Sequence, residues 1–135
     1  MLKRSLLPIL LLALPLGAEV LETPPTEQVA RGEYLAKHVA MCVQCHSPHS
    51  RNGDLQQSRL FEGQAIPVKG PYPDADNWAF NAPALKQLPG WTVEEFVHLL
   101  TKGSRISGQK PKSPMPPFRM SKQDAEAIAA YLKSL

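Results

Sequence analysis

The only two cysteines of this 135-residue chain, Cys42 and Cys45, are separated by two residues and followed at once by His46. A thioredoxin-like redox pair uses the same spacing, but it belongs to a strand-to-helix turn in an α/β pattern, which this sequence lacks. A structural zinc site needs four protein ligands, and no second close pair of cysteine or histidine ligands follows at a suitable spacing. A chance occurrence of the motif is the remaining alternative.

The run Cys42-Val43-Gln44-Cys45-His46 is the attachment signature for c-type haem. Each thiol adds across one vinyl group of a porphyrin, and a two-residue gap at the end of a helix lets both sulfurs reach neighbouring vinyls. Imidazole ligates both ferrous and ferric iron, and the thioethers prevent dissociation of the cofactor. The motif therefore predicts one covalently bound haem c, attached at Cys42 and Cys45, with His46 as an axial ligand to iron.

The N-terminus has the three parts of a secretory signal. Lys3 and Arg4 precede an apolar run over residues 6–16, and two small residues follow it. The run is shorter than the ~20 apolar residues of a transmembrane helix, and two prolines interrupt it. We expect a signal peptide over residues 1–18, one domain over residues 19–135 and a periplasmic location, with membrane association if the leader is retained.

Charge is distributed unevenly along the chain. Removing the leader lowers the formal charge from +3 to +1, so nucleic acid is not an implied partner. Between Glu95 and Asp124 there is no acidic residue, and this stretch is either a solvated loop or a docking face for an acidic redox partner. Its basic residues are Lys102, Arg105, Lys110, Lys112, Arg119 and Lys122.

Three helices are predicted, separated by long connections in a chain with 14 prolines. The first runs from about Thr26 to the first cysteine; the second begins at a capping box of Thr92 and Glu95 and ends at Gly103; the third is capped by Ser121 and reaches the C-terminus. Apolar residues recur at helical spacing on each. The predicted buried positions are Val29, Gly32, Leu35, Ala36 and Val39; Val93, Phe96, Val97 and Leu100; and Ala125, Ile128, Ala129, Tyr131 and Leu132.

More than forty residues between His46 and Pro89 lack a convincing helix, which is unusual in a compact domain. A bound porphyrin would supply the packing surface that such a loop needs. A short hairpin around Ala65 to Val68 is also predicted. The apolar side chains expected to pack on the porphyrin are Phe61, Ile66, Val68, Tyr72, Trp78 and Phe80.

A methionine thioether is the usual sixth ligand of an electron-transfer haem, because soft sulfur favours ferrous iron. Met1 is lost with the leader, and Met41 adjoins the first attachment cysteine. Met115 stands between prolines that restrict its loop, whereas Met120 precedes the Ser121 cap, where an apolar residue often packs on its own helix. Met115 is the predicted ligand, with Met120 as the alternative.

Histidine is the other option for the sixth ligand. His98 lies in line with Glu94 and Lys102 on the polar face of the second predicted helix. His38 and His49 flank the attachment motif too closely to reach the far haem face without a large detour. The histidines are therefore the weaker candidates.

With its attachment motif near the N-terminus, a methionine in a proline-rich loop and a terminal helix ending Ala130-Tyr131-Leu132-Lys133, the chain resembles class I cytochrome c over residues 28–135. The resemblance implies an all-α fold of three main helices and long loops around one covalent haem. It also implies a tight crossing of the N- and C-terminal helices, with Gly32 and Tyr34 against Ile128, Tyr131 and Leu132.

More narrowly, Leu88-Pro89-Gly90-Trp91-Thr92, Gly103 and Met115-Pro116-Pro117-Phe118 resemble the cytochrome subunits of bacterial membrane-bound dehydrogenases. Those subunits often carry several haems, and this chain has one motif, which leaves the partner open between a dehydrogenase and a terminal oxidase.

The expected function is single-electron transfer between redox proteins, without transformation of a substrate. The alternatives are a five-coordinate haem sensor or peroxidase-like enzyme, and an electron-relay subunit of a larger enzyme. Arg119 and Trp91 are candidates for pairing with the haem propionates, and spacing does not choose between them.

Overall fold

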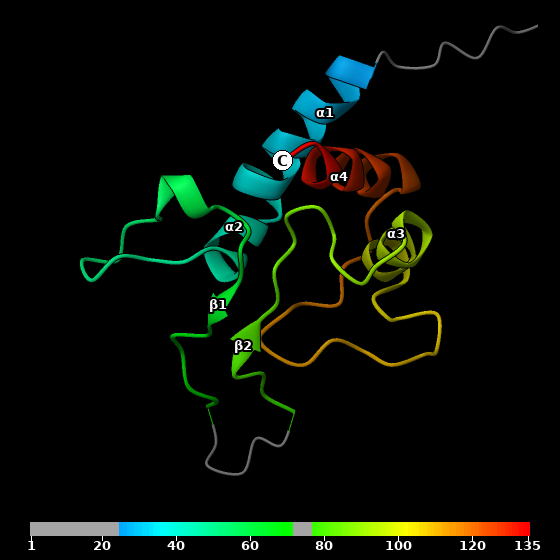
Figure 1. The fold of residues 1–135 in the computed structure, drawn as a ribbon. Helices are drawn as coiled ribbons and strands as arrows, with labels where there is room; N and C mark the ends of the chain where they lie inside the picture. Colours follow the sequence, from blue (N-terminus) through cyan, green and yellow to red (C-terminus); the bar gives the residue numbers. More distant parts are fainter. Residues whose placement is uncertain (1–24, 72–76) are drawn as a thin grey trace, which may run out of the picture.

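The computed structural model describes residues 25–71 and 77–135, so the predicted signal peptide over residues 1–18 lies outside the described residues. The described chain is mostly helical, with one two-stranded sheet and long connecting loops (Figure 1). In chain order the elements are α1 (Pro25–Tyr34), the π-helical turn η1 (Leu35–Val39), α2 (Cys42–His46), the 3₁₀ turn η2 (Gln57–Arg59), β1 (Gln64–Ala65), β2 (Asn81–Ala82), α3 (Val93–Lys102) and α4 (Lys122–Ser134).

The first predicted helix is divided in two. α1 widens into the π-helical turn η1, and Met41 then takes a left-handed conformation with φ 55°, so α2 begins afresh at Cys42. The predicted helix is confirmed over residues 25–39, but it ends three residues before Cys42 instead of reaching it, because local periodicity does not reveal the left-handed Met41. Val39, expected to be buried, is 55 % exposed beside this break.

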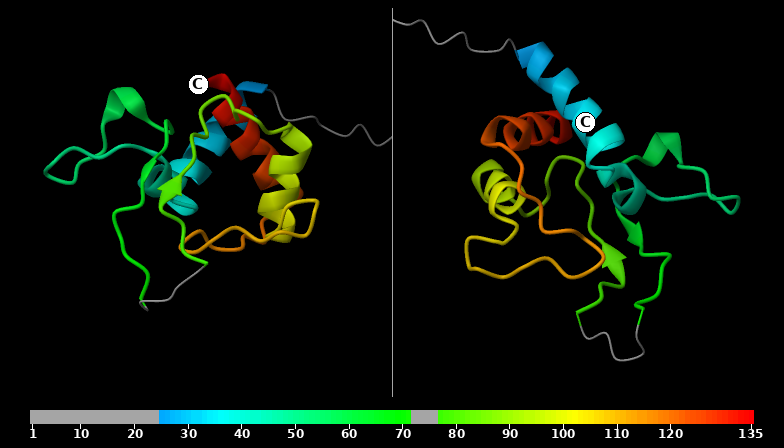
Figure 2. Two further views of the ribbon diagram at one scale, coloured as in Figure 1. Left: turned by 60° about the horizontal axis from the view of Figure 1, so that its bottom comes forward. Right: turned by 180° about the vertical axis from the view of Figure 1, so that it is seen from behind.

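α1 and α4 cross in close contact, as Figure 2 shows from two further directions. Gly32 lies at the crossing, where a Cβ would stand 1.9 Å from the Ala127 carbonyl oxygen and 2.8 Å from Tyr131 Cβ. The expected packing role of this glycine is confirmed. Tyr34, expected in the same contact, is instead 57 % exposed and stacks on His38.

The predicted ends of α3 and α4 are confirmed. The Thr92 hydroxyl accepts a hydrogen bond from Glu95 N–H while the Glu95 carboxylate accepts one from Thr92 N–H, and Gly103 ends α3 in the left-handed conformation. Ser121 caps α4 through Asp124 N–H. On α3, however, Val93 is 46 % exposed and Leu99 is buried. The buried face therefore begins at Phe96, later than predicted, and includes Leu99.

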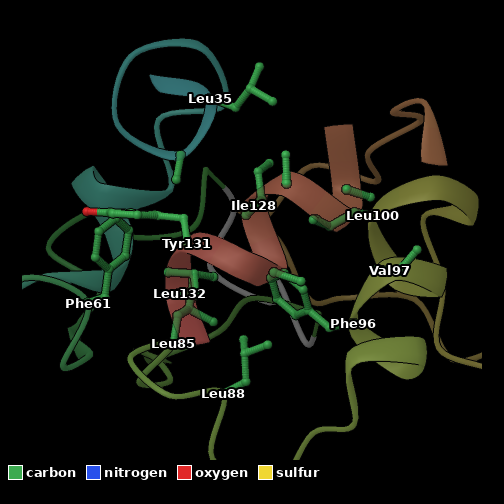
Figure 3. Packing of buried hydrophobic residues seen from close by; sticks show 14 of the residues in the cluster. Leu35, Phe61, Leu85, Leu88, Phe96, Val97, Leu100, Ile128, Tyr131 and Leu132 are labelled. Carbon is green, nitrogen blue, oxygen red and sulfur yellow. The ribbon is translucent and has the colours of Figure 1, made fainter. Parts of the chain in front are cut away.

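The core lies between α4, α3 and the chain leading into α3 (Figure 3). Phe61 meets Tyr131 edge to face with ring centroids 5.8 Å apart, and Leu85 and Leu88 close the core from the loop before α3. This burial stabilises the crossing helices, since each large apolar side chain contributes about 1.5–3 kcal/mol when fully buried. The largest core side chains are Leu35, Phe61, Leu85, Leu88, Phe96, Leu100, Ile128, Tyr131 and Leu132.

The long loop is arranged differently from the prediction. β1 pairs antiparallel with β2, with Gln64 opposite Ala82 and Ala65 opposite Asn81, instead of forming a local hairpin over residues 65–68. The hairpin prediction was wrong, because the partner strand comes from the far side of the loop. Among the described residues, no helix is long and apolar enough to cross a membrane.

Candidate functional site

A cavity of about 300 Å³ lies between α2, β2, α3 and the loop that precedes α4, which reaches β2 in Figures 1 and 2. Cys42, Cys45, His46 and Met115 all line it, although 68 residues separate the motif from Met115 in sequence. Most of the other lining groups are apolar or aromatic, as expected of a small-molecule site. They include Ile66, Leu85, Trp91, Phe96, Leu99, Leu100 and Phe118.

His46 is held by α2 and is 7 % exposed. Its Nδ1 lies 2.7 Å from the Pro83 carbonyl oxygen, which can only accept, so Nδ1 carries the proton and Nε2 keeps its lone pair. Burial lowers the pKa of His46, and the bond to Pro83 opposes that shift. The geometry thus provides a neutral, oriented imidazole of the kind that ligates metals.

The two cysteines are free thiols, with Cys42 half-buried and Cys45 exposed. Burial raises the pKa of the Cys42 thiol to about 11, with a smaller contribution of the same sign from Cys45. A thioredoxin-like pair needs a lowered thiol pKa to act as a nucleophile, so the environment of Cys42 does not suit that role. Within residues 25–71 and 77–135, no three His, Cys, Asp or Glu side chains gather into a metal site, which a protein-only zinc centre would need.

The two candidate methionines occupy different surroundings. Met115 is half-buried and lines the cavity, and its N–H donates to the Lys112 carbonyl oxygen at 3.2 Å. Met120 packs against the hydrophobic core, and its N–H donates to the Leu100 carbonyl oxygen at 3.0 Å. Met41 also lines the cavity, next to Cys42, and is 44 % exposed. Of the two candidates left by the sequence, Met115 and Met120, only Met115 lines the cavity with His46.

The alternative histidines lie away from this cavity. His38 stacks on Tyr34, and His98 is half-buried on α3. His49 Nδ1 lies 3.1 Å from Gln64 Oε1, on the loop that follows α2. None of the three is among the residues that line the cavity with His46.

Basic side chains that sequence reasoning did not single out stand at the cavity. Arg105 lines it, with its guanidinium carbon 4.3 Å from the centre of the Trp91 ring, and Lys112 lines it as well. Arg119, one of the two candidates from the sequence, instead donates from Nη1 to the Phe118 carbonyl oxygen at 2.9 Å and does not line the cavity. The signal for Arg105 was its membership of the basic stretch, which did not distinguish it from five neighbours.

The loop side chains expected to face a porphyrin mostly do not line the cavity. Ile66 does, whereas Phe61 is fully buried in the core. Phe80 is 83 % exposed and Val68 is 54 % exposed, because Ala79 and Asn81 are the cavity-lining residues of this extended segment and Phe80 alternates to the other side. For Phe61, Val68 and Phe80 the expected cavity role was wrong. Tyr72 lies outside the described residues, and Trp78 is half-buried and does not line the cavity.

The chain is similar to known cytochromes both in its family and in an individual relative. The model of the family "Cytochrome C oxidase, cbb3-type, subunit III" matches residues 27–132. The chain is also 29 % identical over 118 residues to the cytochrome c subunit of a quinone alcohol dehydrogenase from Gluconobacter oxydans (strain 621H). That alignment covers 80 % of this chain and 24 % of the relative, so the chain spans about a quarter of the length of the relative it matches.

Proposed function

The chain belongs to the family of the cbb3-type cytochrome c oxidase subunit III and is a c-type cytochrome, and from this premise we propose that it carries single electrons on one covalently bound haem c. The haem supplies the ferrous/ferric couple when bound. The observation that carries the proposal is the gathering of two thiols, one neutral imidazole and the Met115 thioether around one largely apolar cavity. In this proposal no substrate is transformed.

In this proposal Cys42 and Cys45 hold the porphyrin through thioethers, and His46 and Met115 are the axial ligands. The support for His46 is its Nδ1 bond to Pro83, which leaves Nε2 free. The support for Met115 is its place in the cavity on a proline-flanked loop, which restricts the thioether before it binds. A thioether ligand raises the reduction potential relative to histidine, because soft sulfur stabilises ferrous iron.

The proposal extends to the haem propionates. Arg105 supports this role best, because it lines the cavity while stacked on Trp91, and a guanidinium pairs with carboxylates through two parallel hydrogen bonds. Trp91 lines the same part of the site and donates only through its indole N–H. Arg119 is not included, since its guanidinium faces the Phe118 carbonyl oxygen.

The partner is proposed from charge and from likeness. Arg105 and Lys112 place positive charge at the cavity, and Lys102 and Lys110 are exposed nearby in the chain. Such charge speeds encounter with an acidic redox partner, and salt screens this attraction, so the acceleration falls as ionic strength rises. The dehydrogenase subunit it resembles makes a membrane-bound dehydrogenase one candidate and a terminal oxidase the other. If the rate constant of electron transfer with an acidic partner did not depend on ionic strength, the docking role would be contradicted.

The class I fold and the location complete the proposal. The crossing of α1 and α4 at Gly32 supports the class I arrangement. An exported, periplasmic protein is proposed from the leader over residues 1–18, because haem attachment of this type suits an exported chain.

The first test is the optical spectrum of the reduced, mature protein with and without carbon monoxide. We expect no change in the wild-type spectrum, since both axial positions are held by side chains. Met115→Ala should bind carbon monoxide at once. Met120→Ala is the matched control: it removes a neighbouring methionine that packs on the core, and should leave the spectrum unchanged.

A prompt carbon monoxide shift in the wild-type protein would contradict His/Met ligation and favour the sensor or peroxidase-like alternative. A carrier and a relay subunit differ in assembly. Stable co-purification with a dehydrogenase or oxidase would identify a relay subunit, whereas a shuttle should purify alone.

A further inference from the structure

One short segment, residues 77–83, joins the two parts of the chain that carry the proposed iron ligands. At its C-terminal end the Pro83 carbonyl oxygen accepts from His46 Nδ1 at 2.7 Å. At its N-terminal end Ser113 N–H donates to the Asn77 carbonyl oxygen at 2.9 Å, and Ala79 N–H donates to the Ser113 carbonyl oxygen at 2.7 Å. We call residues 77–83 the bridging segment; Figure 1 shows β2 within it beside the orange loop.

The bridging segment is stiffened along its length by β1. β1 pairs with β2, and Ile66 N–H adds a bond of 2.8 Å to the Phe80 carbonyl oxygen. Gly63 N–H, just before β1, donates to the His46 carbonyl oxygen at 2.7 Å, so both strands are fastened to the same histidine. A paired segment transmits position better than a single extended strand, because each ladder bond restricts the backbone of both strands.

Few hydrogen bonds tie the loop that carries Met115 to the rest of the described chain, although Arg105 stacks on Trp91 and Phe118 packs against the core. Residues 104–119 make several hydrogen bonds among themselves, such as Arg105 N–H to Gln109 at 2.7 Å and Met115 N–H to Lys112 at 3.2 Å. Within the described parts of the chain, the only hydrogen bonds that join residues 104–119 to another segment are the two at Ser113. Ser113 stands two residues before Met115, so the position of the thioether depends directly on this pair of bonds.

We propose that the backbone pair between Ala79 and Ser113 positions Met115 as the sixth ligand, so that the bridging segment sets both axial ligands together. Ala79 and Ser113 are positioning residues, since neither is a proposed iron ligand. If their bonds opened, Met115 would no longer be held toward the iron, whereas Cys42, Cys45 and His46 would continue to hold the haem. The inference rests on the proposed His/Met ligation.

The test is Ala79→Pro, which removes the N–H donated to Ser113 and keeps an extended backbone. Phe80→Pro is the matched control: among the described residues its N–H makes no backbone hydrogen bond, and its side chain is exposed. The probe is carbon monoxide mixed with the reduced holoprotein, followed by absorbance. We expect about a fivefold faster reaction of Ala79→Pro, the population change that follows loss of one hydrogen bond, and a control close to wild type.

The outcomes separate this inference from the proposed function. Rapid carbon monoxide binding by the wild-type protein would overturn the His/Met ligation itself. If carbon monoxide reacted equally slowly with wild type and with Ala79→Pro, the positioning role would be overturned and the His/Met ligation would stand. Equal opening in Ala79→Pro and Phe80→Pro would also overturn it, because any proline in the loop would then have the same effect.

If Ala79→Pro loses its helical circular dichroism, the same coupling is measured from the other side. Coupling between two interactions is reciprocal: if the bonds between Ala79 and Ser113 stabilise ligation by Met115, then ligation by Met115 stabilises those bonds equally. In holo Met115→Ala, the amide hydrogens of Ala79 and Ser113 should exchange about fivefold faster than in wild type. The Met120 amide, bonded to Leu100, is the internal reference and should not change. Unchanged exchange at Ala79 and Ser113 would overturn the inference.

Discussion

Gly32 and Ala127 bring the backbones of α1 and α4 so close together that one added methyl group on the glycine would stand 1.9 Å from the Ala127 carbonyl oxygen. The obstacle is backbone, which cannot rotate away as a side chain can. The crossing therefore requires a residue without a Cβ, despite the cost of about 1 kcal/mol for glycine inside a helix. It also joins the helix that leads toward the attachment motif to the C-terminal helix.

We expect Gly32→Ala to destabilise the holoprotein by about 1–3 kcal/mol, the usual cost of forcing extra volume into a packed contact. The gain in helix propensity offsets only part of this cost. Chemical denaturation measures the free energy of unfolding. Ala30→Val adds methyl groups at an exposed site on the same helix and should lower it only by about 0.5 kcal/mol, the lower helix propensity of valine. If Gly32→Ala and wild type had the same free energy of unfolding, α1 and α4 could move apart to admit the methyl group without loss of stability.

The two cysteines should each form one thioether. We expect Cys45→Ala, with one attachment left, to retain haem through denaturation and extraction with acidified organic solvent, whereas the double variant with Cys42→Ala should release all of it. Haem absorbance in the protein and solvent fractions measures the partition. Retention by the double variant would contradict covalent attachment at these positions. Ser47→Ala, next to the motif and buried, is the control for disturbance of this region.

Arg105 should influence the reduction potential. A cation at the cavity favours the ferrous state, which carries less positive charge, so Arg105→Leu should lower the potential by an amount on the order of tens of millivolts. Redox titration followed by absorbance measures the shift. Arg51→Leu makes the same change at an exposed site that does not line the cavity, and should leave the potential within error. Equal shifts in both variants would indicate a general charge effect instead of a role at the cavity.

The capping box of α3 should make stability depend on pH in acid. Hydrogen bonds from the Thr92 backbone, and then from its hydroxyl, lower the pKa of Glu95 below its ordinary value of 4.5. The ionised cap therefore stabilises the fold above pH 4.5, and that contribution is lost as the pH falls through the lowered folded-state pKa. Urea midpoints should fall less between about pH 6 and pH 3 in Glu95→Gln than in wild type.

Glu94→Gln is the control for this pH dependence, because Glu94 is exposed in the same turn and its side chain makes no hydrogen bond among the described residues. Its profile should follow wild type. If Glu94→Gln flattened the profile as much as Glu95→Gln, the effect would come from the charge of the helix start and not from the cap.

The sequence by itself determined the features that depend on neighbouring residues. Thr92, Gly103 and Ser121 predicted the ends of α3 and α4, because a cap acts within one turn of its own helix. The attachment motif, which also lies within one turn, is the basis of the proposed haem attachment at Cys42 and Cys45. Proline spacing singled out Met115, which the structure brings into the cavity with His46.

Only the tertiary structure decided which distant segments meet. The left-handed Met41, the pairing of β1 with β2 and the burial of Phe61 against Tyr131 depend on contacts between parts of the chain that local periodicity does not relate. The same holds for Arg105, which the loop returns to the cavity over Trp91, and for the bonds that fasten Ser113 to the bridging segment. Side-chain type sets what a residue can bind, whereas long-range packing sets which residues bind together.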